Sequence, residues 1–120
     1  MNETIDKAIW AHSSWKVHLK NAIETGQSDF TVEQAQNHHA CAFGKWLDSA
    51  EGRTLPHYLE IAELHREFHQ EASHILNLAL TGRKSEATDK MHLGSPFSQL
   101  TARLVNKLAE IGQPKQESKR

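Results

Sequence analysis

The chain has 120 residues, a length that suits one small domain, and its 14 basic and 15 acidic side chains leave a net charge of −1. This balance offers no basic stripe to a nucleic acid, no apolar run approaches the roughly 18 residues that span a bilayer, and the first residues do not form a signal peptide. A single cysteine allows no internal disulfide, so no oxidising compartment is implied. From these observations together we expect a cytoplasmic protein with neither a nucleic-acid nor a membrane partner.

The first predicted element is a helix over residues 2–24. Its core-facing stripe recurs at alternating steps of four and three residues, as a helix requires: Ile5, Ile9, His12, Lys16, Leu19 and Ile23. His12 lies in the middle of this stripe, and Trp15 follows one turn later. Gly26 is expected to end the helix.

The second predicted helix runs from Thr31 to about Ala50. Thr31 and Gln34 have the spacing of a capping box, which marks a helix start. This segment carries the only cysteine, Cys41, and Gly44 follows it. A glycine inside a helix costs about 1 kcal/mol relative to alanine, so we expect another backbone to approach closely at Gly44.

The third predicted helix begins near Leu55 and Pro56 and runs to about Leu80, since proline suits a first helical turn. It has two apolar stripes, one through Tyr58, Ala62, His65, His69, Ala72, Leu76 and Ala79, the other through Leu64, Phe68, Ile75 and Leu78. A helix with two apolar faces has more than one neighbour, either within its own bundle or across a dimer. Together with Trp10, which lies off the stripe of the first helix, this predicts a homodimer.

The fourth predicted helix is capped by Ser85 and extends to Ile111, with a kink or break near Pro96, which removes a backbone hydrogen bond. Four helices joined by short loops predict an all-α fold, an up-down-up-down four-helix bundle. We assign residues 1–112 to this domain and expect 113–120 to be a disordered polar tail or the start of a linker.

Nine histidines are scattered through the chain, a composition typical of metal binding or pH sensing. His65 and His69 are four residues apart and therefore share one helix face. They are either two half-buried histidines or two metal ligands, and they do not form the catalytic His-Glu-x-x-His pattern. With Cys41 and the apolar-stripe His12 they make a closed tetrahedral set for Zn²⁺. A closed set leaves no place for a reactive water, so we expect no enzyme.

Three motifs together resemble the signature of the chemoreceptor zinc-binding (CZB) domain family: His12-x-x-Trp15, Cys41-Ala-Phe-Gly44-Lys-Trp46 and His65-x-x-x-His69. The resemblance implies that His12, Cys41, His65 and His69 carry the zinc ligands, on a four-helix bundle that usually dimerises. It further implies a regulatory module of bacterial chemoreceptors or diguanylate cyclases that responds to zinc or to oxidants such as hypochlorous acid. The sequence contains no output domain, so the partner stays open.

The other histidines receive a simpler interpretation. His38 or His39, close to Cys41, is a candidate to orient a metal ligand. We expect the rest to be exposed or structurally satisfied: His18, His57, His74 and His92. Trp15, Phe43 and Trp46 are expected to pack in the core.

Two alternative functions stay open. The first is a hemerythrin-like di-iron or oxygen-binding bundle, which is also helical and rich in histidine. It would need bridging carboxylates spaced with the histidines, and His57 has Ile61 rather than a glutamate four residues on. The second is a plain dimerisation bundle with a vestigial metal site.

Overall fold

The first helix, α1, is the longest element of the computed structural model, which describes residues 2–39 and 41–112. It spans Asn2–Thr25, close to the predicted range. Gly26 ends it with a backbone φ of +75°, and the Gly26 N–H donates to the Ala22 carbonyl at 2.8 Å. Ile5 and Leu19 are fully buried, and His12, midway between them, is 1% exposed. The helical stripe predicted from the sequence therefore faces the core, except at Lys16, where the prediction is wrong because this side chain is exposed.

The prediction of one helix from Thr31 to Ala50 is wrong, because the segment contains two short helices, α2 (Val32–Gln36) and α3 (Ala42–Asp48). The capping box at Thr31 and Gln34 is confirmed. The helix fails at Asn37, whose side-chain oxygen accepts the His39 N–H at 3.1 Å. A local turn of this kind competes with the helical ladder. Cys41 consequently precedes α3 in extended backbone, with φ −66° and ψ 141°, and is not inside a helix.

The third long segment begins later than predicted. A short 3-10 helix, η1 (Gly52–Thr54), comes before it, and α4 spans Tyr58–Leu80. His57, with a left-handed φ of 61°, turns the chain into α4, so Pro56 is not in the first turn. Both apolar stripes of α4 are largely buried within this one chain. The second stripe therefore finds its neighbours within this chain, which is one of the two outcomes expected for it, and it does not require a partner chain.

The fourth predicted helix is not merely kinked but divided into α5 (Lys84–Asp89) and α6 (Pro96–Gly112). Pro96 is the first residue of α6, where its missing N–H costs nothing, and Gly94 has a φ of +87° just before it. Arg83, not Ser85, occupies the N-cap position of α5. The tail predicted for residues 113–120 lies outside the described residues.

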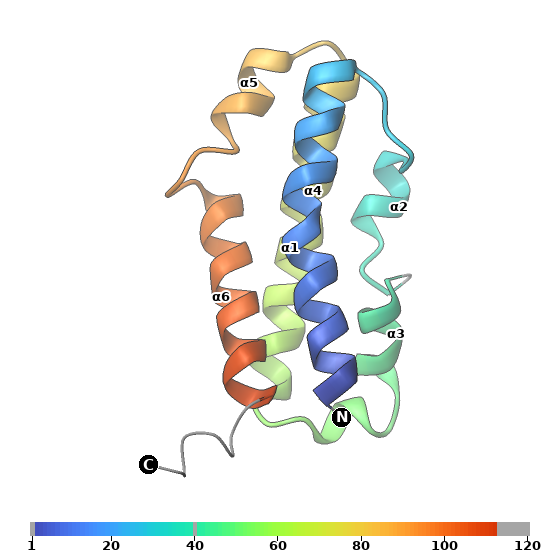
Figure 1. Ribbon diagram of the computed structural model, residues 1–120. Coiled ribbons are helices and arrows are strands. Elements are labelled where there is room, and N and C mark those ends of the chain that lie inside the picture. The colour runs from blue at the N-terminus through green and yellow to red at the C-terminus, as the bar shows by residue number, and fades with distance from the viewer. Residues whose placement is uncertain (1, 40, 113–120) are drawn as a thin grey trace.

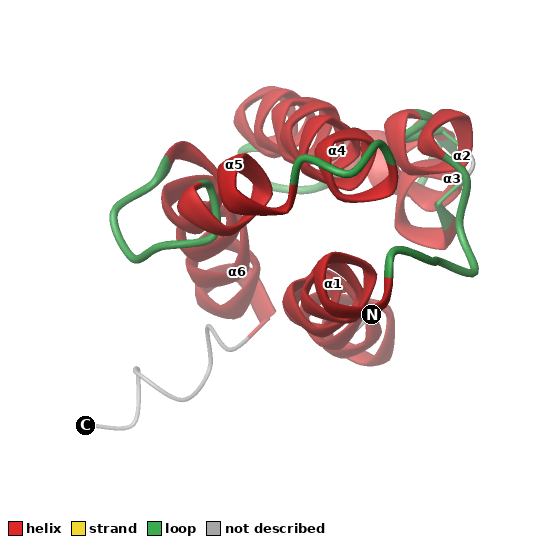
Figure 2. Ribbon diagram, turned by 90° about the horizontal axis from the view of Figure 1, so that it is seen from above, coloured by secondary structure: helices red, strands yellow, loops and turns green. Residues whose placement is uncertain are grey.

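The all-α prediction is confirmed: within 2–39 and 41–112 every regular element is helical. α1 and α4 pack side by side, with α2 and α3 along one side of the pair and α5 and α6 along the other (Figures 1 and 2). Within these ranges six α-helices take the place of the four expected, of which only the fourth was expected to be kinked or broken. The rings of Phe68 and Phe97, 5.3 Å apart, join α4 to α6 in the core. No helix in the described part of the chain is long and apolar enough to cross a membrane.

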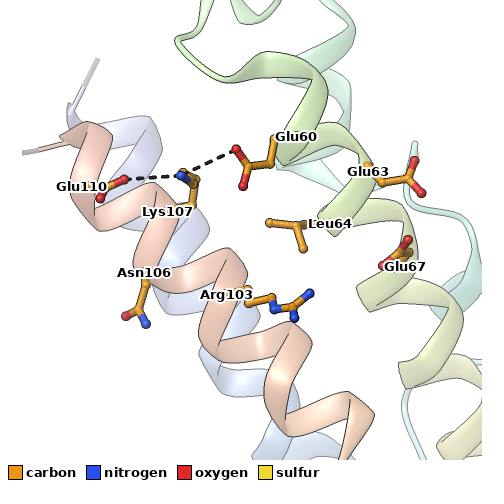
Figure 3. A pocket seen from close by; sticks show the side chains of 8 residues that line it. All are labelled: Glu60, Glu63, Leu64, Glu67, Arg103, Asn106, Lys107 and Glu110. Carbon is orange, nitrogen blue, oxygen red and sulfur yellow. Dashed lines mark ion pairs between the residues drawn. The ribbon is translucent and has the colours of Figure 1, made fainter.

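A groove of about 570 Å³ runs between the first turns of α4 and the second half of α6 (Figure 3). Lys107 on α6 forms ion pairs with Glu60 on α4 at 3.6 Å and with Glu110 at 3.5 Å. Leu64 lies between the charged rows, as Figure 3 shows. Neither histidine nor cysteine is among the residues that line this groove. The ion pair between Lys107 and Glu60 joins α6 to α4, whereas the pair between Lys107 and Glu110 lies within α6.

Candidate metal centre

The rings of His12 and His69 are each held by a hydrogen bond from one ring nitrogen to a backbone carbonyl. The Nδ1 of His12 is 2.8 Å from the Ala8 carbonyl, one turn earlier in α1. The Nδ1 of His69 on α4 is 2.8 Å from the Ala35 carbonyl on α2. A carbonyl only accepts, so Nδ1 carries the proton in both rings and donates it. The Nε2 of each ring therefore keeps a free lone pair, the form in which imidazole binds a metal.

His65 is fully buried, at 0% exposure, and neither of its ring nitrogens has a hydrogen-bond partner within the described residues. The Nε2 of His69, itself 2% exposed, is also without one. Burying a polar group without a partner costs on the order of 1–3 kcal/mol. A metal ion between these nitrogens would supply the missing partner.

Cys41 completes the group from the loop before α3, a position that the sequence predicts to be helical. Its Sγ is 3.9 Å from the Nε2 of His12. One ligand atom from each of four residues lies within 4.8 Å of all the others: His12, Cys41, His65 and His69. Ordinary zinc bond lengths place tetrahedral ligand atoms about 3.5 Å apart. The four atoms thus surround a space that a small inward shift would fit to zinc.

Burial keeps the three imidazoles neutral. It lowers the pKa of His12 from 6.5 to about 4, against the opposing effect of the hydrogen bond to Ala8. Burial is the largest cause that lowers the pKa of His65 to about 2, and the nearby His12 and His69 rings lower this pKa further. Burial also lowers the pKa of His69. Metal ligation requires unprotonated imidazole, so all three rings are ready to bind at neutral pH.

Aromatic side chains enclose the histidines. The His12 ring meets Phe68 edge-on with centroids 5.1 Å apart, and the His65 ring meets Phe43 at 5.2 Å. Phe43 is buried as predicted, whereas Trp15 and Trp46 are only partly buried and pack against the core from outside. These apolar rings surround the imidazoles with a medium of low dielectric constant, which strengthens electrostatic interactions there.

His38 and His39 do not orient the cluster through hydrogen bonds. The His38 ring approaches His65 edge-on at 5.8 Å between centroids, but the His65 nitrogens stay unpartnered in the described structure. His39 is exposed, and its Nδ1 lies 2.8 Å from Asp48. The remaining four are exposed, as expected: His18, His57, His74 and His92.

Backbone carbonyls take the orienting role that was considered for His38 and His39. The Ala8 carbonyl was recoverable from the sequence, because residue i−4 lies beneath His12 on any helix. The Ala35 carbonyl was not. It becomes free to accept from His69 because α2 ends one residue later, at Gln36, and no sequence signal predicted that early end.

A comparison with known families gives a match over residues 12–76, more than half of the chain, to the model described as the chemoreceptor zinc-binding domain. The matched range begins at His12 and includes Cys41, His65 and His69. Searches of curated proteins and of solved structures found no match.

Proposed function

The chain belongs to the chemoreceptor zinc-binding domain family, and on this premise we propose that it is a regulatory zinc-binding module of bacterial signalling. His12, Cys41, His65 and His69 are the proposed ligands. The observation that carries the proposal is the fully buried His65, whose two nitrogens lack partners among the described residues while three further donor atoms converge beside it. Zinc is the metal that the family binds, and the donor set fits it.

The proposed site is regulatory rather than catalytic. Three imidazoles and one thiolate fill the tetrahedral positions of zinc, which leaves none for water or substrate. Bound zinc would hold Cys41 in the thiolate form. The chain itself supplies the orientation: the Ala8 and Ala35 carbonyls fix the rings of His12 and His69, so that their Nε2 atoms point to one place.

The proposed signal is either zinc itself or oxidation of the zinc-bound Cys41. Cys41 connects the site to the short helix α3, and His69 connects it to α2. A change at the site is therefore transmitted first to this divided segment. The proposed output is a cytoplasmic chemoreceptor or diguanylate cyclase that the module controls.

We further infer that the six helices act as one up-and-down bundle of four segments, the second and fourth being broken, and that the bundle forms a homodimer. The exposed Leu59 and Leu93, at 80% and 90% exposure, leave apolar surface for such a contact. The two alternative functions have less support. In the described residues the cluster contains no carboxylate to bridge two irons, and a vestigial site would not maintain unpartnered buried nitrogens at a cost in stability.

Alanine substitution of each proposed ligand tests the site. The apparent zinc-binding free energy of structural sites, about 10–16 kcal/mol, is shared by four ligands, so losing one should weaken binding on the order of 100-fold. Zinc content after purification without a tag and competition with a chromogenic chelator would measure this. The exposed His92→Ala is the matched control and should bind like the natural chain. Equal loss of zinc in His92→Ala and His65→Ala would contradict the assignment, as would two irons per chain.

A further inference from the structure

A cleft of about 450 Å³ opens beside the cluster, on the side where α1 faces the loop before α2. Six of its lining residues matter to the argument: Trp10, Trp15, Asp29, Phe30, Cys41 and His69. The three histidines of the cluster are at most 2% exposed, whereas Cys41 is only half-buried. The cleft therefore reaches the cluster at Cys41 and His69, and of these two only Cys41 is appreciably exposed.

Three large aromatic side chains form part of the cleft wall, beside polar side chains that include Ser14, His18 and Gln34. Trp15 packs on Phe30 with ring centroids 4.9 Å apart, and Trp15 also meets His69 at 6.3 Å. Trp10 forms the outer part of the wall and is 73% exposed, a large apolar surface to leave in water. Aromatic faces in a concave site give the apolar part of a ligand a surface to pack against, while polar groups beside them orient the rest of the ligand.

We propose that this cleft is the access route to Cys41, and that it favours uncharged electrophiles bearing an apolar group, such as organic hydroperoxides, over anions. The inference rests on the proposed zinc site and assigns its chemical selectivity. Trp10, Trp15 and Phe30 would hold the apolar group, while the electrophilic atom faces the sulfur. Asp29, on the rim, would repel anionic reagents.

With an organic hydroperoxide the reaction is a two-electron transfer. The Cys41 thiolate attacks the terminal oxygen, an S–O bond forms and the O–O bond breaks. The electron pair leaves with the alkoxide, which takes a proton from water. Cysteine is oxidised to sulfenic acid and the hydroperoxide is reduced to the alcohol. The sulfenic sulfur is a poorer metal ligand, so only the three imidazoles would hold zinc, and they would release it more readily.

The first test compares zinc release from the zinc-loaded chain by cumene hydroperoxide and by hydrogen peroxide, with oxidation of Cys41 followed by mass. The ratio of the two rate constants cancels any change in the intrinsic reactivity of the sulfur. Trp10→Ala should lower this ratio on the order of fivefold, because one aromatic contact is lost, and Trp10→Phe should retain most of it. Val17→Ala, an exposed apolar change on the same helix, is the matched control.

The second test uses the metal-free chain and thiol-specific methanethiosulfonates, one neutral and one carrying a sulfonate. Asp29→Asn should raise the rate of the anionic reagent a few-fold and leave the neutral one unchanged. Asp6→Asn removes the same charge from an exposed site on α1 that does not line the cleft, and should change neither. The proposal is overturned if Trp10→Ala leaves the ratio of the two peroxide rate constants unaltered and Asp29→Asn leaves the ratio of the two methanethiosulfonate rate constants unaltered. It is also overturned if the control variants alter these ratios to the same extent. A chain that binds no zinc defeats the proposed function instead, because labelling of the metal-free thiol still reports on the route.

Discussion

Gly44 is the residue whose small size the site depends on. A Cβ built at this position would lie 1.8 Å from the His38 carbonyl oxygen and 3.2 Å from Cε1 of His65. The close backbone approach predicted from the sequence is therefore confirmed. The backbone that approaches Gly44 belongs to the loop just before α3. Gly44 allows this loop to fold back onto α3, and the same loop leads into Cys41.

Gly44→Ala should therefore lower the zinc affinity, and this loss should exceed what its effect on folding stability alone would cause. The added methyl group must displace the His38 carbonyl or press on His65, and either movement spoils the position of a proposed ligand. We expect at least a tenfold loss of zinc affinity, a size typical of changes next to metal ligands. Competition with a chelator, together with the thiolate-to-metal absorption of the cobalt-substituted protein, would measure it.

Gly52→Ala is a demanding control for this experiment. A Cβ at Gly52 would lie 2.1 Å from the Trp46 carbonyl oxygen, so the steric conflict is similar, but none of the nearest atoms belongs to the proposed ligands. Both variants should lose thermal stability, and only Gly44→Ala should change the cobalt spectrum. Identical spectra for the two variants would show that Gly44 has no special part in positioning the ligands.

Among the elements, the divided segment of α2 and α3 has the least intrinsic stability. The two helices have five and seven residues, well below the roughly 12–15 at which a helix is even marginally stable alone. By contrast, α1 and α4 have 24 and 23 residues. The short segment is fastened to the long helices partly through Ala35 and His69 and, in the proposed site, through Cys41 and the metal.

Loss of zinc should therefore loosen residues 32–48 before the rest of the bundle. Hydrogen exchange, measured before and after treatment with a chelator or with an oxidant, would locate the change. We expect increased exchange in α2, α3 and the loop between them, with protection of α4 largely kept. A uniform increase along all described helices would mean that the metal simply stabilises the whole fold, and the idea of a local switch would fail.

For the whole molecule, the buried imidazoles make stability depend on pH. In the folded metal-free chain burial lowers the pKa of His12 from 6.5 to about 4 and lowers those of His65 and His69. The unfolded chain takes up these protons at higher pH than the folded chain does. The corresponding stability is thus present above pH 6.5 and is lost as the pH falls towards about 4.

Denaturant unfolding of the metal-free protein at pH 7, 6 and 5 should show this decline. Each buried histidine contributes up to about 1.4 kcal/mol per pH unit within its window. His12→Gln should reduce the slope because it removes one of the protons that the unfolded chain gains. A free energy of unfolding that is flat between pH 7 and 5 would show that the histidines are not buried as neutral rings in the metal-free state.

Assembly is the second property of the whole molecule. We predict a homodimer, which sedimentation of the zinc-loaded chain at tens of micromolar would detect. Leu59→Glu and Leu93→Glu should favour the monomer if these exposed side chains lie in the contact, because burying a charge there is costly. A monomer in the natural chain at that concentration would contradict the proposal.

Features set by local periodicity were predictable from the sequence alone. The range of α1, the C-terminal end of α4 and the capping box at Thr31 all follow from spacing or from neighbouring side chains. His65 and His69 share a face because 3.6 residues make one helical turn. The chemical types of the proposed ligands, and the resemblance of their spacing to a zinc-binding family, were likewise visible in the linear order.

Features that depend on competition between segments were decided by the tertiary structure. Asn37 ends α2 because its side-chain turn outcompetes the helix, and Pro96 divides the fourth segment where the sequence allowed either a kink or a break. Only packing of α1 and α4 against the divided segment brings His12 and Cys41 to His65. Only the early end of α2 frees the Ala35 carbonyl for His69. Burial, the lowered pKa values and the cleft at Cys41 arise from contacts between residues far apart in the chain, which helical periodicity does not encode.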